Sequence, residues 1–170
     1  MGYAEAIQAL DRLKGQGIIR EYALIGAVAA AAYSEPVATE DLDIVVLVDT
    51  DEQYLDVLRA SGAMAERREG MHLVFGGVPV QMFPTTIKAL YREALEQGKI
   101  RDIGAVRVRV ASCEHLILLA LEAFRYKDRA RVYQLLPVAN KERLKLLLTR
   151  LDDEKHTLAS RLRTLGGEIV

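Results

Sequence analysis

The sequence predicts an α/β (α+β) fold in which a mixed sheet is flanked by helices and followed by a helical C-terminal extension. An apolar run at residues 42–49, two strand-like runs around Gly76-Gly77 and the alternating segment 105–112 all favour strands. From residue 112 onward the pattern is helical only. We therefore expect an α/β domain at residues 1–111 and a helical region at residues 112–170 packed on it.

Composition narrows the classes of protein to consider. The 170 residues are 51% hydrophobic, so the chain can bury a substantial core. Its formal net charge is −1, from 23 basic and 24 acidic residues, which argues against binding of long nucleic acid through overall charge. The single cysteine, Cys113, cannot form an internal disulfide. The start is amphipathic rather than a signal peptide, and no apolar run approaches the roughly 20 residues of a membrane span, so we expect a cytoplasmic protein.

The first half of the chain begins with a helix. Apolar residues recur at helical spacing over residues 3–13, and the glycines that follow end the pattern. Residues 21–26 resemble a short strand, and the alanine-rich segment 27–35 predicts a helix that is broken by Pro36. The β-branched run 42–49 is apolar at successive positions, as in a central strand covered on both faces.

The next elements alternate between helix and strand. Residues 52–61 and 86–98 have the pattern of helices that end at glycines. Between them, the dipeptide Gly76-Gly77 can provide the positive φ angles of a tight turn, so residues 71–84 predict a hairpin. In the strand at 105–112 we expect the valines to point inward and two arginines to point outward, Arg107 and Arg109.

Two long helices are expected in the C-terminal region. Ser112 can cap a helix that runs through residues 113–136, and Pro137 ends it. A second helical stretch covers residues 140–164, with leucines along one face. This leucine face is interpreted as packing surface, with self-association into a homo-oligomer as the alternative.

The candidate chemistry lies at the start of the apolar run. Asp41 and Asp43 are two residues apart on a predicted strand, so both side chains project from one face, roughly 6 to 7 Å apart at the backbone. Paired carboxylates of this kind bind hard divalent cations that assist phosphoryl or nucleotidyl transfer. Upstream, a strand that ends at Gly26 and opens into a helix offers free backbone N–H groups to a phosphate. The alternative interpretation is a solvated, polar strand start.

The segment YALIGAVAAAAYSEPVATEDLDIVVLVD, with GGVPVQMFP downstream, resembles the minimal nucleotidyltransferase superfamily. It is similar in particular to the abortive-infection toxin type. In that superfamily a glycine-rich turn precedes an Asp-x-Asp strand, and a third aspartate lies on a later strand. Weaker resemblance continues through residues 113–136. The resemblance implies Asp41 and Asp43 as catalytic and metal-binding residues, Mg²⁺ or Mn²⁺ as cofactor, NTP as substrate, and six nucleotide-binding positions: Gly26, Ala27, Thr39, Gln81, Arg125 and Lys127.

The sequence also departs from the superfamily pattern. Ala27 replaces the second Gly or Ser of the turn, and Gln81 stands where the third aspartate is usual. A glutamine can offer a neutral oxygen but cannot act as a carboxylate base. Further along, Ala120 replaces a frequent lysine and Arg131 replaces an acidic residue.

Two functions therefore remain open from the sequence. The first is an Mg²⁺-dependent enzyme that transfers NMP from NTP to an unknown hydroxyl acceptor on RNA, a protein or a small molecule. The second is a catalytically degenerate nucleotide-binding or regulatory protein that keeps the fold. A carboxylate supplied from elsewhere, such as Glu69 or Asp102, would favour the enzyme. His72 lies in an apolar run and has either a structural role or a position near the cleft. The arginines of the C-terminal region either contact a ligand or form a solvated face.

Overall fold

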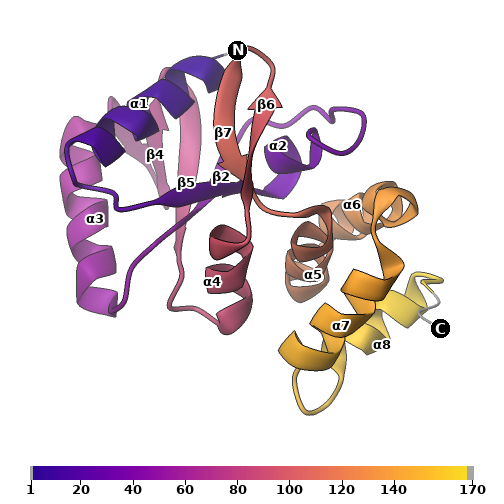
Figure 1. Ribbon diagram of the computed structural model, residues 1–170. Coiled ribbons are helices and arrows are strands. Elements are labelled where there is room, and N and C mark those ends of the chain that lie inside the picture. Colours follow the sequence, from indigo (N-terminus) through magenta and orange to yellow (C-terminus); the bar gives the residue numbers. More distant parts are fainter. Residues whose placement is uncertain (1, 168–170) are drawn as a thin grey trace.

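The computed structural model describes residues 2–167, which form a seven-stranded mixed sheet with helices around it (Figure 1). The strands are β1 (Tyr22–Ile25), β2 (Leu42–Val46), β3 (Arg67–Glu69), β4 (His72–Phe75), β5 (Val78–Pro84), β6 (Lys99–Ile103) and β7 (Val106–Val110). The helices are α1 (Tyr3–Gly15), α2 (Gly26–Ala30), α3 (Asp51–Met64), α4 (Ala89–Glu96), α5 (Cys113–Ala123), α6 (Tyr126–Leu135), the 3₁₀ helix η1 (Leu136–Val138), α7 (Lys141–Leu151) and α8 (Thr157–Thr164). The predicted fold class is confirmed.

Strand order places β2 at the centre of the sheet. The order is β3-β4-β5-β2-β1-β7-β6, with β2 antiparallel to β1 and parallel to β5. The predicted hairpin is present as the antiparallel pair β4 and β5, and Gly76 and Gly77 both have positive φ. The start of β2 therefore lies beside the carboxyl end of β1.

The core is one continuous hydrophobic cluster on both sides of β2. Ile44, Val45 and Val46 are consecutive on the strand and have no exposed surface, which confirms the prediction of a strand covered on both faces. The same cluster contains Ile117 and Leu121 of α5. The C-terminal helices thus share the core of the sheet rather than forming a separate one.

Side-chain alternation assigns the two faces of the sheet. The rings of Phe83 on β5 and Tyr91 on α4 pack with centroids 6.1 Å apart. Because strand side chains alternate, Gln81 lies on the same face of β5 as Phe83 and points toward the α4 side. In Figure 1, α1 and α3 lie to the left of the strands, and α4 with the C-terminal helices lies below and to the right.

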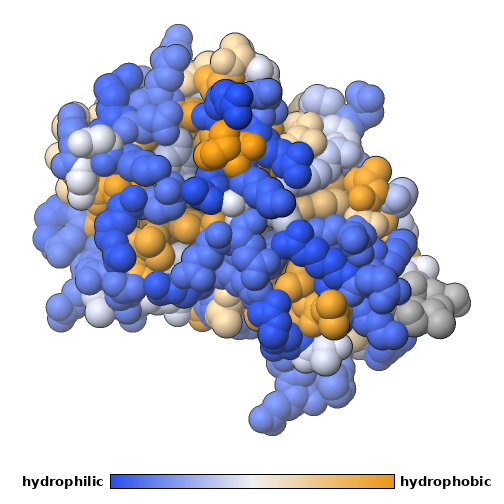
Figure 2. Space-filling model, viewed as in Figure 1, coloured by the Kyte–Doolittle hydropathy of each residue, from blue (hydrophilic) through white to orange (hydrophobic). Residues whose placement is uncertain are grey.

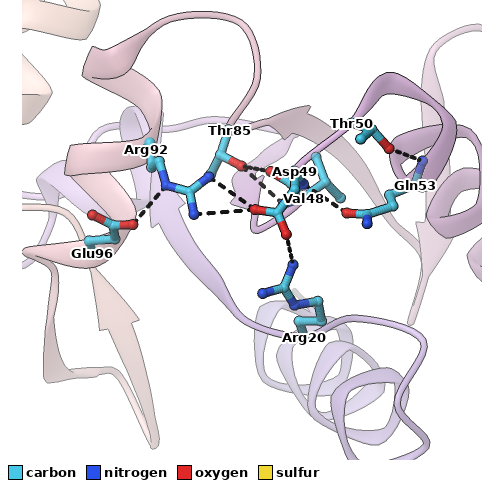
Figure 3. Close-up of polar contacts among 8 residues, drawn as sticks. All are labelled: Arg20, Val48, Asp49, Thr50, Gln53, Thr85, Arg92 and Glu96. Atoms are coloured by element: carbon cyan, nitrogen blue, oxygen red, sulfur yellow. Dashed lines mark hydrogen bonds and ion pairs between the residues drawn. The ribbon is translucent and has the colours of Figure 1, made fainter.

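Polar contacts hold the far end of β2 (Figure 3). The buried hydroxyl of Thr85 donates to the carbonyl of Val48 at 2.7 Å and accepts from its N–H at 2.9 Å. Asp49 accepts from Arg20 at 2.8 Å and from Arg92 at 3.3 Å, and these arginines lower the pKa of its carboxyl. These contacts fix the strand that carries Asp43, but they lie at the opposite end of it.

The prediction of two uninterrupted C-terminal helices is wrong. The first breaks at Phe124, which adopts the left-handed conformation with φ 52°, so that α5 and α6 are separate helices. The second is interrupted at residues 152–156, between α7 and α8, and His156 has φ 54°. Neither break is marked by glycine or proline, the residues that usually end a helix, and the leucine spacing continues across the second break. Leu144, Leu148, Leu158 and Leu162 are all buried.

Two edge strands were not expected. All residues of β3 are exposed, and β6 is exposed except for Ile103, so neither has the apolar alternation by which a strand is detected. The alanine-rich helix is also shorter than expected and covers only Gly26–Ala30. By contrast, Val108 and Val110 of β7 are buried and Arg107 is exposed, as predicted. The Arg109 side chain, also expected to point into solvent, is only 29% exposed and donates to the carbonyl of Gly98 at 2.7 Å.

The surface mixes hydrophilic and apolar side chains. Figure 2 shows apolar patches scattered among hydrophilic residues on the face in view. Among the described residues, every helix is too short or too polar to cross a membrane.

Candidate functional site

Asp41, Asp43 and Gln81 lie together at the end of the sheet where the central strand β2 begins. Asp43 is paired with Ile25 of β1 on one side and with Gln81 of β5 on the other. Neighbouring strands are about 4.8 Å apart, so Asp43 and Gln81 project side by side from the same face. Asp41 lies two residues earlier, immediately before β2, and its side chain is 40% exposed. The site thus combines a half-buried and a more exposed carboxylate with a neutral amide.

Gly26 lies directly against Asp43. It has φ +74°, and a Cβ atom built on it would be 2.5 Å from the Oδ2 atom of Asp43. Only glycine avoids both the strained backbone and this overlap. The helix that begins here has five residues, so its dipole is small, and Ala27 adds no polar atom. The close approach to Asp43 is a second reason for a glycine at this turn.

The loop before β2 is tied to α1. The phenol of Tyr3 donates a hydrogen bond to the carbonyl of Thr39, and the Thr39 hydroxyl is 3.5 Å from the carbonyl of Asp41. Burial, together with the negative charges of Asp41 and Glu40, raises the pKa of Tyr3. Thr39 therefore contacts the backbone that carries Asp41, rather than projecting as a free hydroxyl.

Among residues 2–167, no third carboxylate joins the pair. Glu69 accepts from the Nε atom of Arg67 at 2.7 Å, and Asp102 lies on the edge strand β6, 3.7 Å from Arg107. Instead, the Nε2 atom of His72 lies 3.6 Å from Oδ2 of Asp41. Between residues 2 and 167 there is no cluster of three or more His, Cys, Asp or Glu side chains arranged to hold a metal.

Helix α6 brings cationic side chains to this end of the sheet. Asp128 is 1% exposed and accepts from Nε of Arg125 at 2.7 Å and from Arg131 at 3.1 Å. It also accepts from the backbone N–H of Arg125 at 3.1 Å, which caps the first turn of α6. The Arg131 side chain is only 12% exposed, whereas that of Arg125 is 63% exposed. Asp128 therefore fixes the orientation of both guanidinium groups.

The charges of α6 act on Asp43. Burial raises the pKa of the Asp43 carboxyl, and repulsion from Asp41 adds to this effect. The positive charges of Arg131, Lys127 and Arg125 act in the opposite direction and stabilise the carboxylate. The hydrogen bond to Asp128 is the main cause of the raised pKa of Arg125, and the negative charges of Asp128 and Asp43 add to it.

Two of the side chains at this site could hold one hard divalent cation. Mg²⁺ is commonly held by one or two carboxylates when substrate phosphates and water complete its shell. Asp41 and Asp43 provide those carboxylates, and the Gln81 amide oxygen is a neutral neighbour. A pair of cations usually needs further bridging carboxylates, which these residues do not provide.

Comparison with solved structures gives matches along nearly the whole chain. An antigenic nucleotidyltransferase-like protein from Paracoccidioides brasiliensis is 17% identical, with a TM-score of 0.56 over 95% of this chain and 85% of that one. ANT(2″)-Ia, in a complex with adenylyl-2″-tobramycin, is 13% identical with a TM-score of 0.58, over 98% of this chain and all of that one. The chain has a nucleotidyltransferase-like fold.

A solution structure of the antibiotic-resistance factor ANT(2″)-Ia supports the same fold. It is 16% identical, with a TM-score of 0.55 over 94% of this chain and 92% of that one. No protein-family model matches the sequence, and no curated protein matches it either. At these identities the nucleotidyltransferase-like fold is what the comparisons establish.

The sequence identified most of the residues that meet at the start of β2, but not how they contact one another. Asp41, Asp43 and Gly26 were singled out by strand spacing and by the turn before them. The buried Asp128 contacts and the approach of His72 to Asp41 could not be read from one sequence, because both depend on elements that are distant along the chain. The sequence shows the arginines at residues 125–131, but it does not show that Asp128 pairs with two of them.

Proposed function

We propose that the protein is a nucleotidyltransferase that uses Mg²⁺ or Mn²⁺ and NTP. The observation that carries this proposal is the placement of Asp41 and Asp43 beside Gly26 and the cations of α6, within a nucleotidyltransferase-like fold. In this proposal, Asp41 and Asp43 hold one divalent cation together with the triphosphate. Such a cation would neutralise phosphate charge and would stabilise the departing pyrophosphate.

The residues of α6 have a separate role in this proposal. The exposed side chains of Arg125 and Lys127 bind the phosphates, while Arg131 balances the charge of Asp43. An acceptor hydroxyl oxygen attacks the α-phosphorus, and the bond from this phosphorus to the bridging oxygen of pyrophosphate breaks. The hydroxyl proton passes to solvent, because Gln81 stands in place of a third carboxylate base.

The acceptor is proposed by chemical class only. ANT(2″)-Ia is described in a complex with an adenylylated aminoglycoside, adenylyl-2″-tobramycin, which makes a hydroxyl of a small polar molecule one acceptor to test. RNA and protein hydroxyls are the others. We also propose kinship with the abortive-infection toxin type and a cytoplasmic location, which rest on the sequence TEDLDIVVLVD and on the single cysteine.

A second function is favoured by Gln81 and Arg131. A neutral amide next to Asp43, and a guanidinium that acts on the same carboxylate, reduce the negative charge available to a cation. The second proposal is accordingly a nucleotide-binding or regulatory protein that binds NTP without efficient transfer.

Label transfer separates the two proposals. Purified protein is incubated with Mg²⁺ or Mn²⁺, α-labelled NTPs and panels of RNA, protein and small-molecule acceptors. The enzyme proposal predicts labelled acceptor that disappears in the Asp41→Asn/Asp43→Asn variant. The matched control is Asp56→Asn/Asp153→Asn, which removes two exposed carboxylates elsewhere. Transfer that survives the loss of Asp41 and Asp43 contradicts the assignment, and binding without transfer supports the second proposal.

A further inference from the structure

A second cavity lies at the start of α5 and α7, apart from the carboxylate site. Its volume is about 300 Å³, and none of the residues named for the carboxylate site lines it. This volume is at the lower end of the range of about 300 to 1,000 Å³ that is typical of small-molecule pockets. The walls come from the turn after α2, from β6, α5 and α7, and from the segments before these helices, and include Tyr33, Lys99, Arg101, Ser112, Asn140 and Arg143.

The charged residues in the lining of this cavity are mostly cationic. Lys99 and Arg101 are two residues apart on β6, so their side chains project from the same face. Within residues 2–167, neither makes an ion pair with a carboxylate. Arg143 adds a third positive charge from α7.

Glu114 is the one carboxylate in the lining, and its oxygens are already engaged. Its Oε1 atom accepts from the backbone N–H of Asn140 at 2.7 Å, and its Oε2 atom is 3.7 Å from Arg143. The Glu114 side chain is 8% exposed. It therefore offsets Arg143 and leaves the charges of Lys99 and Arg101 uncompensated.

The cavity is also rigid around Arg101. The Arg101 guanidinium carbon lies 5.0 Å from the centre of the Tyr33 ring, within the range of a cation–π contact. The Tyr33 hydroxyl in turn donates to the carbonyl of Ala111 at 2.8 Å, which anchors the ring. A guanidinium held in this way loses little conformational entropy when a ligand binds.

Two helix N-termini reinforce the positive charge. α5 and α7 each have 11 residues and begin at the cavity, after the capping residues Ser112 and Asn140. Each cap accepts the N–H three residues further on, which leaves the first N–H groups of the helix free to donate.

We propose that this cavity is a second binding site, for a small ligand that carries a phosphate or pyrophosphate group. Clustered basic side chains with fixed guanidinium geometry and free helix N–H groups are the chemistry that recognises phosphate oxygens. The two sites use different residues: Asp43 lies on β2, across β1 from the end of β7, and none of the residues named for the carboxylate site lines the cavity.

The test is an NMR titration of the ¹⁵N-labelled full chain with inorganic pyrophosphate, and then with AMP as a phosphomonoester. We expect saturable shifts of the amides of Cys113, Glu114 and Lys141. Lys99→Gln and Arg101→Gln should each weaken binding about tenfold, as expected when a charge-assisted hydrogen bond is lost. Both side chains are exposed, so the variants should fold normally.

Arg107→Gln is the matched control. Arg107 is on the neighbouring strand β7, its side chain is 74% exposed, and it does not line the cavity. An equal loss of affinity in this variant would show diffuse attraction rather than a site, and the absence of saturable shifts would also overturn the proposal. Asp41→Asn/Asp43→Asn should leave these shifts unchanged, so the result is distinguishable from failure of the nucleotidyltransferase proposal.

Discussion

At the scale of single residues, Gly26 controls the position of a carboxylate. Its Cα lies so close to Asp43 that an added Cβ would be 2.5 Å from Oδ2. We predict that Gly26→Ala lowers the free energy of unfolding by roughly 2 kcal/mol or more, because left-handed backbone strain adds to displacement of Asp43. Urea unfolding measures the change.

Gly17 provides the control for this prediction. It has φ +77°, close to the +74° of Gly26, but a Cβ there would have no neighbour within 4 Å. Gly17→Ala should therefore cost only the backbone strain, about 1 kcal/mol. Equal losses in the two variants would show that contact with Asp43 contributes nothing.

The features of individual residues could be predicted where they depend on neighbours in the sequence. Asp41 and Asp43 share a face because of strand alternation, and the hairpin at Gly76-Gly77 follows from turn chemistry, so both were accessible from the sequence. The positive φ of Gly26 was also foreseeable as a turn feature. Its contact with Asp43 was not, because this contact depends on the antiparallel register of β1 and β2.

At the scale of elements, α6 depends on Asp128. This carboxylate is buried, caps the first turn and bonds Arg125 and Arg131. We predict that Asp128→Asn lowers the free energy of unfolding by about 2 to 3 kcal/mol, because a neutral amide leaves the mostly buried Arg131 with a weaker partner. Chemical denaturation of the variant, combined with Arg131→Gln in a double-mutant cycle, measures the coupling.

Asp56→Asn is the matched control for this element. Asp56 bonds Arg59 three residues later, in the same spacing, but both side chains are more than 70% exposed, at 72% and 78%. Its loss should change stability by less than about 0.5 kcal/mol. If Asp128→Asn behaved in the same way, α6 would not depend on its buried carboxylate.

The boundaries of the helices were the least predictable feature. The chain turns at Phe124 and at His156 without a glycine, and a bulky residue such as Phe124 is rarely found in the left-handed conformation, so the sequence gave no clear sign of either break. At Phe124 the guanidinium groups of Arg129 and Arg161 lie 5.4 and 4.9 Å from the ring centre. These tertiary contacts accompany a break that no local rule predicts.

At the scale of the whole molecule, His115 links the α/β portion to the C-terminal helices. It is fully buried, its Nδ1 atom lies 2.6 Å from the Ser112 hydroxyl oxygen, and its Nε2 atom is 4.0 Å from Glu93 of α4. Burial lowers the pKa of His115 from 6.5 to about 4. The neutral imidazole is therefore the form found in the folded protein at neutral pH.

This pKa predicts acid sensitivity. Between pH 6.5 and pH 4 the unfolded chain binds a proton at His115 that the folded protein does not, so stability falls as pH falls through this window. The loss from pH 7.5 to pH 5 is about 2 kcal/mol for this group. Between these two pH values, the free energy of unfolding should fall by about 2 kcal/mol less in His115→Gln than in the wild-type protein. An equal loss in both proteins would contradict the assignment.

The division of the chain at residue 111 stays a prediction. Leu116, Ile117 and Leu118 are each at most 1% exposed and belong to the same hydrophobic cluster as the sheet. We therefore expect the full chain to unfold in one transition, with far-ultraviolet circular dichroism and tyrosine fluorescence coinciding. A fragment of residues 1–111 should show no cooperative transition, and cooperative melting of the fragment would establish an independent domain.

The central claim is that Asp41 and Asp43 form a cation-dependent nucleotide site, which both proposed functions require. Its most direct test is calorimetric titration of the full chain with non-hydrolysable NTP analogues, in Mg²⁺ and in EDTA. We predict that Asp41→Asn/Asp43→Asn weakens binding in Mg²⁺ by at least tenfold, or about 1.4 kcal/mol, and that EDTA removes the difference. Equal affinities of the two proteins in Mg²⁺ would contradict the account.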